Sequence, residues 1–191
     1  MQDYFTLELS FSSGNCNGWP LISVEGNGQI LWCDYIESQA VVKVNVPIHE
    51  HNCILIRLLN KQDGPDVWDT MLDENSKIVA DKFCILTNIM LARSRCDFLI
   101  LDLDYHLESN EKVPDRVLGF MGKNGFFKIE FPRDVYGWIS RCKKQKTLTP
   151  ERAASSRGYF FNYLNDNDAP IVQKILDEID SLLEDPVWFK H

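Results

Sequence analysis

Residues 5–11 read Phe-Thr-Leu-Glu-Leu-Ser-Phe, with a large apolar side chain at every second position and a polar one between. Successive side chains of a strand point to opposite faces of its sheet, so this alternation predicts a β-strand with one buried face. The same pattern returns at residues 42–46, where three valines alternate with Lys43 and Asn45. The start of the chain is therefore predicted to form β-strands with one buried face.

Short apolar runs separated by turn residues continue to about residue 140. Gly26, Asn27 and Gly28 predict a hairpin turn between two such runs. Residues 53–59 are apolar on both faces apart from Arg57, which is typical of a strand in the middle of a sheet. The Asn-Gly dipeptide at residues 124–125 predicts a second tight hairpin, between residues 117–121 and 126–131. Further strands are expected at residues 67–72, 77–80, 83–91 and 97–105.

Many short strands in succession indicate a mainly β protein, an antiparallel, jelly-roll-like β-sandwich with a C-terminal helical extension. We assign residues 1–140 to the β-sandwich domain and residues 141–191 to the extension. Residues 141–147 are basic and lack an apolar period, so we interpret them as an exposed connection. Helices are expected at residues 151–164 and, with a clear apolar face, at residues 170–183. The periodicity leaves open whether that face packs on the sandwich or on a partner.

Charge and hydropathy exclude some classes of function. The 191 residues include 20 Lys and Arg against 28 Asp and Glu, and the net charge of −8 disfavours nucleic acid as a partner. No apolar run reaches the roughly 18 residues that span a bilayer, and the first residues lack a secretory signal. We therefore expect a soluble protein that is not secreted and does not insert into membranes.

The six cysteines are spread along the chain, and the closest two are twelve residues apart. Zinc sites usually draw ligand pairs from cysteines roughly two to four residues apart, so this spacing does not favour zinc. Several of the cysteines lie inside apolar runs. We expect buried, reduced thiols that pack as small apolar side chains.

The densest acidic cluster surrounds an expected hairpin at residues 66–81. Carboxylates near a hairpin tip can supply part of the oxygen ligand set of calcium, so Asp69, Asp73 and Asp81 are candidate calcium ligands. The spacing is not that of an EF-hand, because Ile78 stands where that loop requires glycine. Turn-forming aspartates on a solvated loop give the same pattern without any metal.

Trp68 lies inside this acidic hairpin. Tryptophan stacks on the apolar face of a sugar ring while neighbouring carboxylates bond the hydroxyls, so Trp68, Asp66, Asp69 and Asp73 are candidate glycan ligands. Core packing is the alternative role for a tryptophan in a sandwich of this size.

Two other groups could carry chemistry. His49 and His51 would share one face of a strand, with Asp104 and His106 as further metal ligands, although a solvated loop explains these histidines equally well. Asp102 and Asp104 share one face of an expected strand, but no other residue completes a glycosidase site. Serine nucleophile elbows, phosphate-binding loops and dinucleotide-binding turns are absent from the sequence. We therefore assign no catalytic residue and expect a protein that is not an enzyme.

The middle of the chain resembles a known module. The stretches that carry the resemblance are residues 51–61, 68–75, 78–82 and 119–132, followed by Trp138 and Ile139. They resemble a β-sandwich module of proteins encoded by contractile-tailed phages of aquatic bacteria, notably cyanophages, which is itself similar to small calcium-dependent carbohydrate-binding modules. Ser76 departs from the pattern at a turn position where glycine is expected.

This resemblance implies a virion-associated protein, made in the host cytoplasm, whose partners are other phage structural proteins. The first hypothesis is therefore a non-enzymatic structural or adaptor protein of a tailed phage. The alternative is a carbohydrate-binding module for a host-surface glycan, with calcium as its candidate cofactor. A metal enzyme built on the histidines is a third hypothesis. The sequence leaves the oligomeric state open, a homo-oligomer included.

Overall fold

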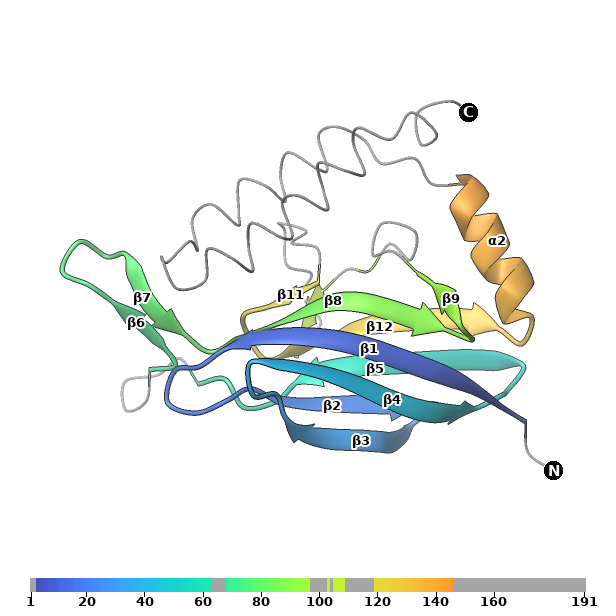
Figure 1. The fold of residues 1–191 in the computed structure, drawn as a ribbon, viewed down its shortest axis with the longest axis horizontal. Helices are drawn as coiled ribbons and strands as arrows, with labels where there is room; N and C mark the ends of the chain where they lie inside the picture. Colours follow the sequence, from blue (N-terminus) through green and yellow to red (C-terminus); the bar gives the residue numbers. More distant parts are fainter. Residues whose placement is uncertain (1–2, 63–67, 97–102, 104, 109–118, 146–191) are drawn as a thin grey trace.

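Two antiparallel five-stranded sheets lie face to face, and a two-stranded ribbon projects beyond one end of them (Figure 1). The structure is a computed structural model that describes residues 3–62, 68–96, 103, 105–108 and 119–145. The expected antiparallel β-sandwich is confirmed. Within the described part of the chain, no helix is long and apolar enough to cross a bilayer.

The first sheet has the strand order β11-β8-β1-β4, and β9 pairs with the end of β8. The bounds of these strands are β1 Tyr4–Gly14, β4 Gln39–Pro47, β8 Phe83–Leu91, β9 Ser94–Arg95 and β11 Phe120–Met121. The second sheet has the order β10-β12-β5-β2-β3. Its strands are β2 Leu21–Gly26, β3 Gln29–Tyr35, β5 His51–Leu58, β10 Tyr105–Leu107 and β12 Gly125–Pro132. The ribbon consists of β6 Thr70–Leu72 and β7 Ile78–Asp81, and the helix α2 spans Val135–Gln145.

The core lies between the two sheets and is built from the alternating positions that the sequence predicts. Leu7 and Leu9 of β1 are completely buried, and so are Ile54 and Ile56 of β5. The expected central strand is confirmed as β5, which lies between β12 and β2. Burying a side chain of this size stabilises the fold by about 1.5–3 kcal/mol, so a few such positions dominate the stability.

The first predicted hairpin is confirmed. β2 pairs with β3 across a turn in which Asn27 (φ 53°) and Gly28 (φ 81°) adopt left-handed conformations. Such a turn matches the right-handed twist of the strands that it connects. The Asn27 side chain also donates to the Pro47 carbonyl at 2.8 Å and accepts from the Cys53 N–H at 2.9 Å. These bonds hold the turn against the end of β4 and the start of β5.

The second predicted hairpin is wrong. β11 pairs with β8 in one sheet and β12 pairs with β5 and β10 in the other, so the turn before Gly125 carries the chain between the sheets. Asn124 does not adopt a left-handed φ. Gly125 is required for another reason, because a Cβ there would lie 2.2 Å from the His106 carbonyl oxygen of β10.

The helix α2 also differs from the expectation of an exposed basic connection, because residues 141–145 form its second half. Asp134 caps the helix by accepting the Gly137 N–H at 3.0 Å, and Val135 and Ile139 are buried against the end of the core. A capping carboxylate and apolar residues four positions apart explain why the chain is helical here. The domain boundary at residue 140 stays a prediction. The expected helices at residues 151–164 and 170–183, and most of the strand at residues 97–105, lie outside the described residues.

All six cysteines are free thiols. Cys16, Cys84 and Cys96 are buried as expected, whereas Cys33 is exposed on β3. Burial raises the pKa of the Cys84 thiol well above its ordinary value.

We predict that the free energy of unfolding falls as the pH rises above the ordinary thiol pKa, about 8.5. The folded state keeps the Cys84 proton that the unfolded state releases, which lowers stability by up to about 1.4 kcal/mol per pH unit. Urea unfolding between roughly pH 7.5 and pH 10 measures this slope. Cys84→Ala should have a shallower slope than the unsubstituted protein, and equal slopes would contradict the prediction.

A candidate binding site at the projecting ribbon

The ribbon carries large apolar side chains into solvent. β6 and β7 pair antiparallel, with Thr70 opposite Asp81 and Met71 opposite Ala80. Among the exposed side chains of this region are Trp68 (56% exposed), Met71 (51%), Leu72 (56%) and Val79 (47%). Exposed apolar side chains that gather on a projecting element are typical of a contact surface.

Two buried ion pairs hold the base of the ribbon. Lys61 Nζ lies 2.5 Å from Asp81 Oδ1, and Lys82 Nζ lies 2.8 Å from Asp69 Oδ2. None of these four side chains is more than 6% exposed. A buried charge is tolerated only when it is paired and hydrogen-bonded, so each lysine neutralises the carboxylate that it contacts.

Further hydrogen bonds position these charges. The Gln62 N–H donates to Asp69 Oδ2 at 2.8 Å, and the Thr70 hydroxyl donates to Asp81 Oδ1 at 2.7 Å. The side chain of Asn124 accepts the Lys61 N–H and donates to the Lys61 carbonyl, both at 2.8 Å. The turn between β11 and β12 therefore holds the backbone of Lys61 in place.

The backbone of Trp68 is anchored in the same region. Its carbonyl oxygen accepts a hydrogen bond from Asn17 Nδ2 at 2.7 Å, and the Cys16 thiol lies 3.8 Å away. Burial raises the pKa of Cys16, and the nearby carboxylates of Asp69 and Asp81 raise it further. The next residue in the chain, Asp69, is completely buried. Trp68 is therefore exposed, while its carbonyl and the following residue are held by hydrogen bonds and by the buried ion pair.

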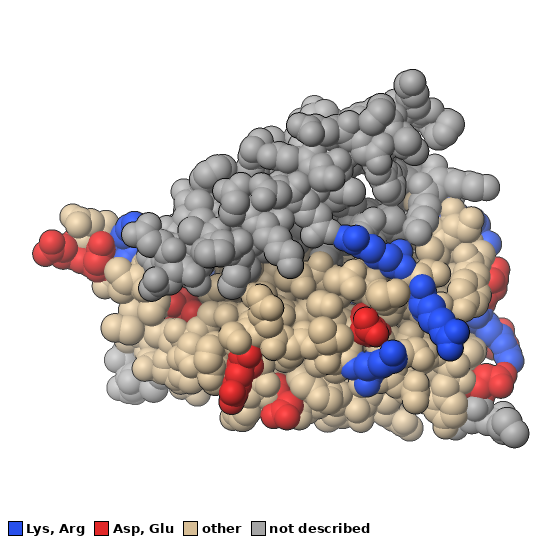
Figure 2. Space-filling view, viewed as in Figure 1, with Lys and Arg blue, Asp and Glu red and all other residues tan. Residues whose placement is uncertain are grey.

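Asp73 organises the far tip of the ribbon. Its Oδ1 accepts the N–H groups of Asn75 and Lys77, both at 2.9 Å. Ser76 has a left-handed φ of 63°, which explains why glycine is expected at this position. Acidic side chains lie at this tip in the space-filling view (Figure 2).

The expected calcium ligands are not brought together. Asp69 and Asp81 lie at the base of the ribbon, whereas Asp73 lies three residues beyond Thr70, roughly 10 Å along the strand. Lysine ammonium groups also stand where a cation would contact Asp69 and Asp81. In this structure the two lysines neutralise Asp69 and Asp81, and calcium binding by these residues stays a prediction. Among the described residues, no three His, Cys, Asp or Glu side chains form a group that could hold a metal. Asp66 lies outside the described residues.

The histidines are separated as well. His51 pairs with Pro132 at one end of β12, and His106 pairs with Phe126 near the other end. Six residues of strand separate these positions, roughly 20 Å. His106 stacks on Phe126 with ring centroids 5.3 Å apart, and Asn52 closes the turn at His49 by accepting its N–H at 2.9 Å. Asp102 and Asp104 lie outside the described residues.

Sequence reasoning identified Trp68 but missed the residues that fix it. Of the tryptophans that the structure describes, Trp68 is exposed, while Trp19, Trp32 and Trp138 are half-buried. These residues come from four separate segments, so no local spacing indicates that they meet: Cys16 and Asn17, Lys61, Lys82, and Asn124. The adjacent pair Asp81-Lys82 is the one local signal that the carboxylates are neutralised.

No family model and no curated protein matches this chain. Two solved structures are similar to it, each over 65% of this chain with a TM-score of 0.44. One is the selenomethionine form of vCBM60, from a study of two families of calcium-dependent carbohydrate-binding modules, with 8% identity over 89% of that chain. The other is vCBM60 in complex with galactobiose, with 10% identity over 96% of that chain. Such a TM-score is too low to transfer a ligand or a metal to this chain.

We predict that Lys82→Met lowers the free energy of unfolding by about 3–5 kcal/mol, because it leaves the Asp69 carboxylate buried without its counter-charge. The double variant Lys82→Met/Asp69→Asn should recover part of this loss, since asparagine is neutral and still accepts the Gln62 N–H. Urea unfolding measures both effects.

The matched control is Lys43→Met, which removes an exposed partner of Glu8 at 3.4 Å. That substitution should lower the free energy of unfolding by less than about 1 kcal/mol. Equal losses in Lys82→Met and Lys43→Met would contradict the structural role of the buried pair.

We also predict that Ser76→Gly stabilises the ribbon by about 1 kcal/mol, because glycine adopts a left-handed φ without the Cβ penalty. Hydrogen exchange at the Lys77 N–H should become slower, since this group reports opening of the tip. Glu74→Gly is the control, because Glu74 does not have a positive φ. Faster exchange in Ser76→Gly would refute the prediction.

Proposed function

We propose that this protein is a non-catalytic binding module that holds a carbohydrate against the indole of Trp68. One observation carries the proposal: an exposed tryptophan stands on a backbone fixed by the Asn17 hydrogen bond and by the buried Asp69–Lys82 ion pair. Sugar recognition uses such a surface, because the apolar face of a pyranose packs on an aromatic ring.

The rigid base of the ribbon favours a higher affinity for a sugar at Trp68. Binding a sugar costs less when the side chains that contact it need no ordering beforehand, and a fixed platform reduces this cost. Gln62 is exposed, and its carbonyl accepts the Asp69 N–H at 2.9 Å, which places it beside Trp68. Its side-chain amide is available to a sugar hydroxyl, whereas the carboxylate of Asp69 is committed to Lys82. The contacts that we propose for the sugar are therefore the indole of Trp68 and the side-chain amide of Gln62.

A second candidate is docking of the ribbon onto another protein, as in a structural or adaptor protein of a phage particle. The observation in its favour is the exposure of Met71, Leu72 and Val79, which offer apolar surface and no group specific for sugars. Apolar clusters of this kind are typical of contacts between proteins.

We predict that Trp68→Ala weakens binding to any glycan that the protein recognises by at least about tenfold, consistent with the energy of aromatic stacking. An array of neutral and acidic oligosaccharides identifies the ligand, and calorimetry measures the affinity. Trp68→Phe should retain part of the binding. Tyr35→Ala is the matched control, because Tyr35 is exposed to a similar extent (55%) but lies on β3.

The outcomes separate the two candidates. Unchanged binding in Trp68→Ala, or an array on which the unsubstituted protein binds nothing, would contradict the carbohydrate proposal. Docking predicts instead that mass spectrometry finds the protein at fixed stoichiometry in purified phage particles, and that Leu72→Ser reduces its incorporation. Consistent absence from particles would contradict the docking candidate.

A further inference from the structure

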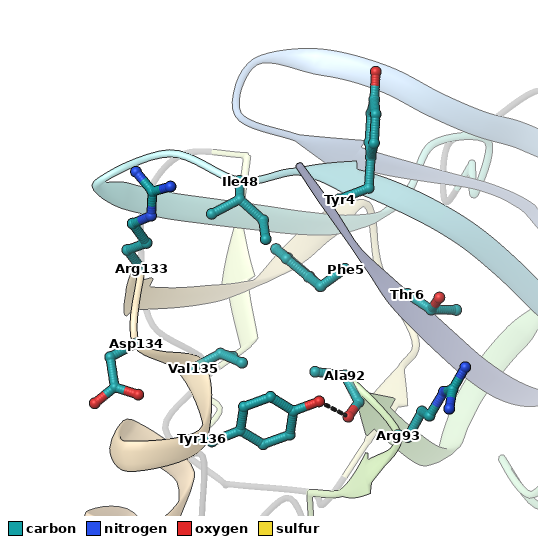
Figure 3. A pocket seen from close by; sticks show the side chains of 10 residues that line it. All are labelled: Tyr4, Phe5, Thr6, Ile48, Ala92, Arg93, Arg133, Asp134, Val135 and Tyr136. Carbon is teal, nitrogen blue, oxygen red and sulfur yellow. Dashed lines mark hydrogen bonds between the residues drawn. The ribbon is translucent and has the colours of Figure 1, made fainter. Parts of the chain in front are cut away.

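A cleft of about 310 Å³ opens at the end of β1, where α2 begins. The N-terminal residues of β1, the turn between β8 and β9, and the junction of β12 with α2 line it (Figure 3). The ribbon projects from the opposite end of the molecule, so Trp68 takes no part in this cleft (Figure 1). Its volume lies at the lower end of the range for small-molecule sites, roughly 300–1,000 Å³.

The cleft combines an apolar floor with exposed aromatic rings. Phe5, Ala92 and Val135 are each no more than 7% exposed, whereas Tyr4 is 55% and Tyr136 is 62% exposed. The Tyr136 ring reaches across toward β8, and its hydroxyl donates to the Ala92 carbonyl at 3.0 Å (Figure 3). A tyrosine held at its hydroxyl presents its ring in a fixed orientation.

The turn that carries Arg93 has an unusual backbone. Ala92 (φ 50°) and Arg93 (φ 66°) are both left-handed, and they form the two-residue connection between the paired residues Leu91 and Ser94. Glycine or asparagine is normally found at such positions, because a Cβ disfavours this conformation. The surroundings hold the turn, since the Ala92 N–H donates to the Thr6 carbonyl at 2.9 Å. Backbone strain of this kind tends to occur at sites of function.

The charges around the cleft leave one cation available. Arg133 lies 3.1 Å from Glu50 and 3.5 Å from Asp3, so its charge is balanced. Asp134 accepts the Gly137 N–H and lies 3.9 Å from Arg141. Arg93 is exposed, and within the described part of the chain its guanidinium has neither a hydrogen bond nor an ion pair. Basic and acidic side chains are interspersed at this end of the molecule (Figure 2).

We propose that this cleft binds an acidic sugar, whose ring packs on Tyr136 and whose oxyanion is held by the guanidinium of Arg93. The planar fork of arginine matches a carboxylate or a phosphate through two parallel hydrogen bonds. The apolar floor and the tyrosine ring suit the face of one sugar ring. This site is separate from Trp68, so it is a second binding site in addition to the proposed function.

Calorimetry with three probes tests the ligand class: glucuronate carries a carboxylate, glucose 6-phosphate carries a phosphate, and glucose is neutral. At least one charged probe should bind tenfold or more tightly than glucose, and the affinity should fall as salt is added. The better of the two charged probes identifies the oxyanion. Equal affinity for all three probes, or no binding of any, would overturn the proposal.

Arg93→Gly is the decisive variant, because glycine suits a φ of 66° and the turn is expected to keep its structure. It should unfold at the same or a higher temperature and bind the charged probe at least tenfold more weakly. Lys77→Ala is the control, since Lys77 is an exposed cation at the tip of the ribbon, at the opposite end of the molecule from the cleft. Unchanged affinity in Arg93→Gly would refute the site. Trp68→Ala should leave binding of the charged probe unaltered. A negative result for the cleft would therefore leave the proposed role of Trp68 standing, and the reverse also holds.

Discussion

The contact between the two apolar faces of the sheets is the constraint on which the rest of the protein depends. Leu7 and Leu9 face Ile54 and Ile56 across one continuous core, and all four are completely buried. Shifting either strand by one residue would turn these side chains to solvent, so the burial also specifies the register of the sheets. The ribbon and the cleft both extend from the rim of this core.

The strands could be predicted because their signal is local, whereas two connections could not. Alternating burial identifies β1 and β5 from a few neighbouring residues. The Asn-Gly dipeptide at residues 124–125 looks like a hairpin turn, but the Asn124 amide instead bonds the backbone of Lys61, 63 residues away. The helix α2 depends on a cap at Asp134 and on packing against the sandwich, which the basic composition of residues 141–145 conceals.

The candidate sites also combine features with a local sequence signal and features that depend on distant residues. Trp68 could be singled out because it lies inside an acidic, polar segment, although its exposure does not follow from the residue type, since tryptophan is often buried. The role of the neighbouring aspartates could not be predicted, because the lysines that neutralise Asp69 and Asp81 become their neighbours only after folding. The sequence offers the acidic residues of this segment as candidates for a metal site or a solvated loop, and in the structure two of them form internal ion pairs. No sequence pattern predicted the cleft at Arg93, since alanine and arginine are not typical of left-handed turns.

The order of the strands in the sheets has a consequence for biosynthesis. Leu7 pairs with Leu91, and Asn52 pairs with Phe131. The central strands β1 and β5 are therefore synthesised well before β8 and β12, with which they pair. Contacts between such distant residues close slowly, because a long loop must be ordered first. During translation the unpaired edges of β1 and β5 are open to chaperones and to other nascent chains. Slow elongation before residue 132 would prolong that exposure and lower the yield of native protein.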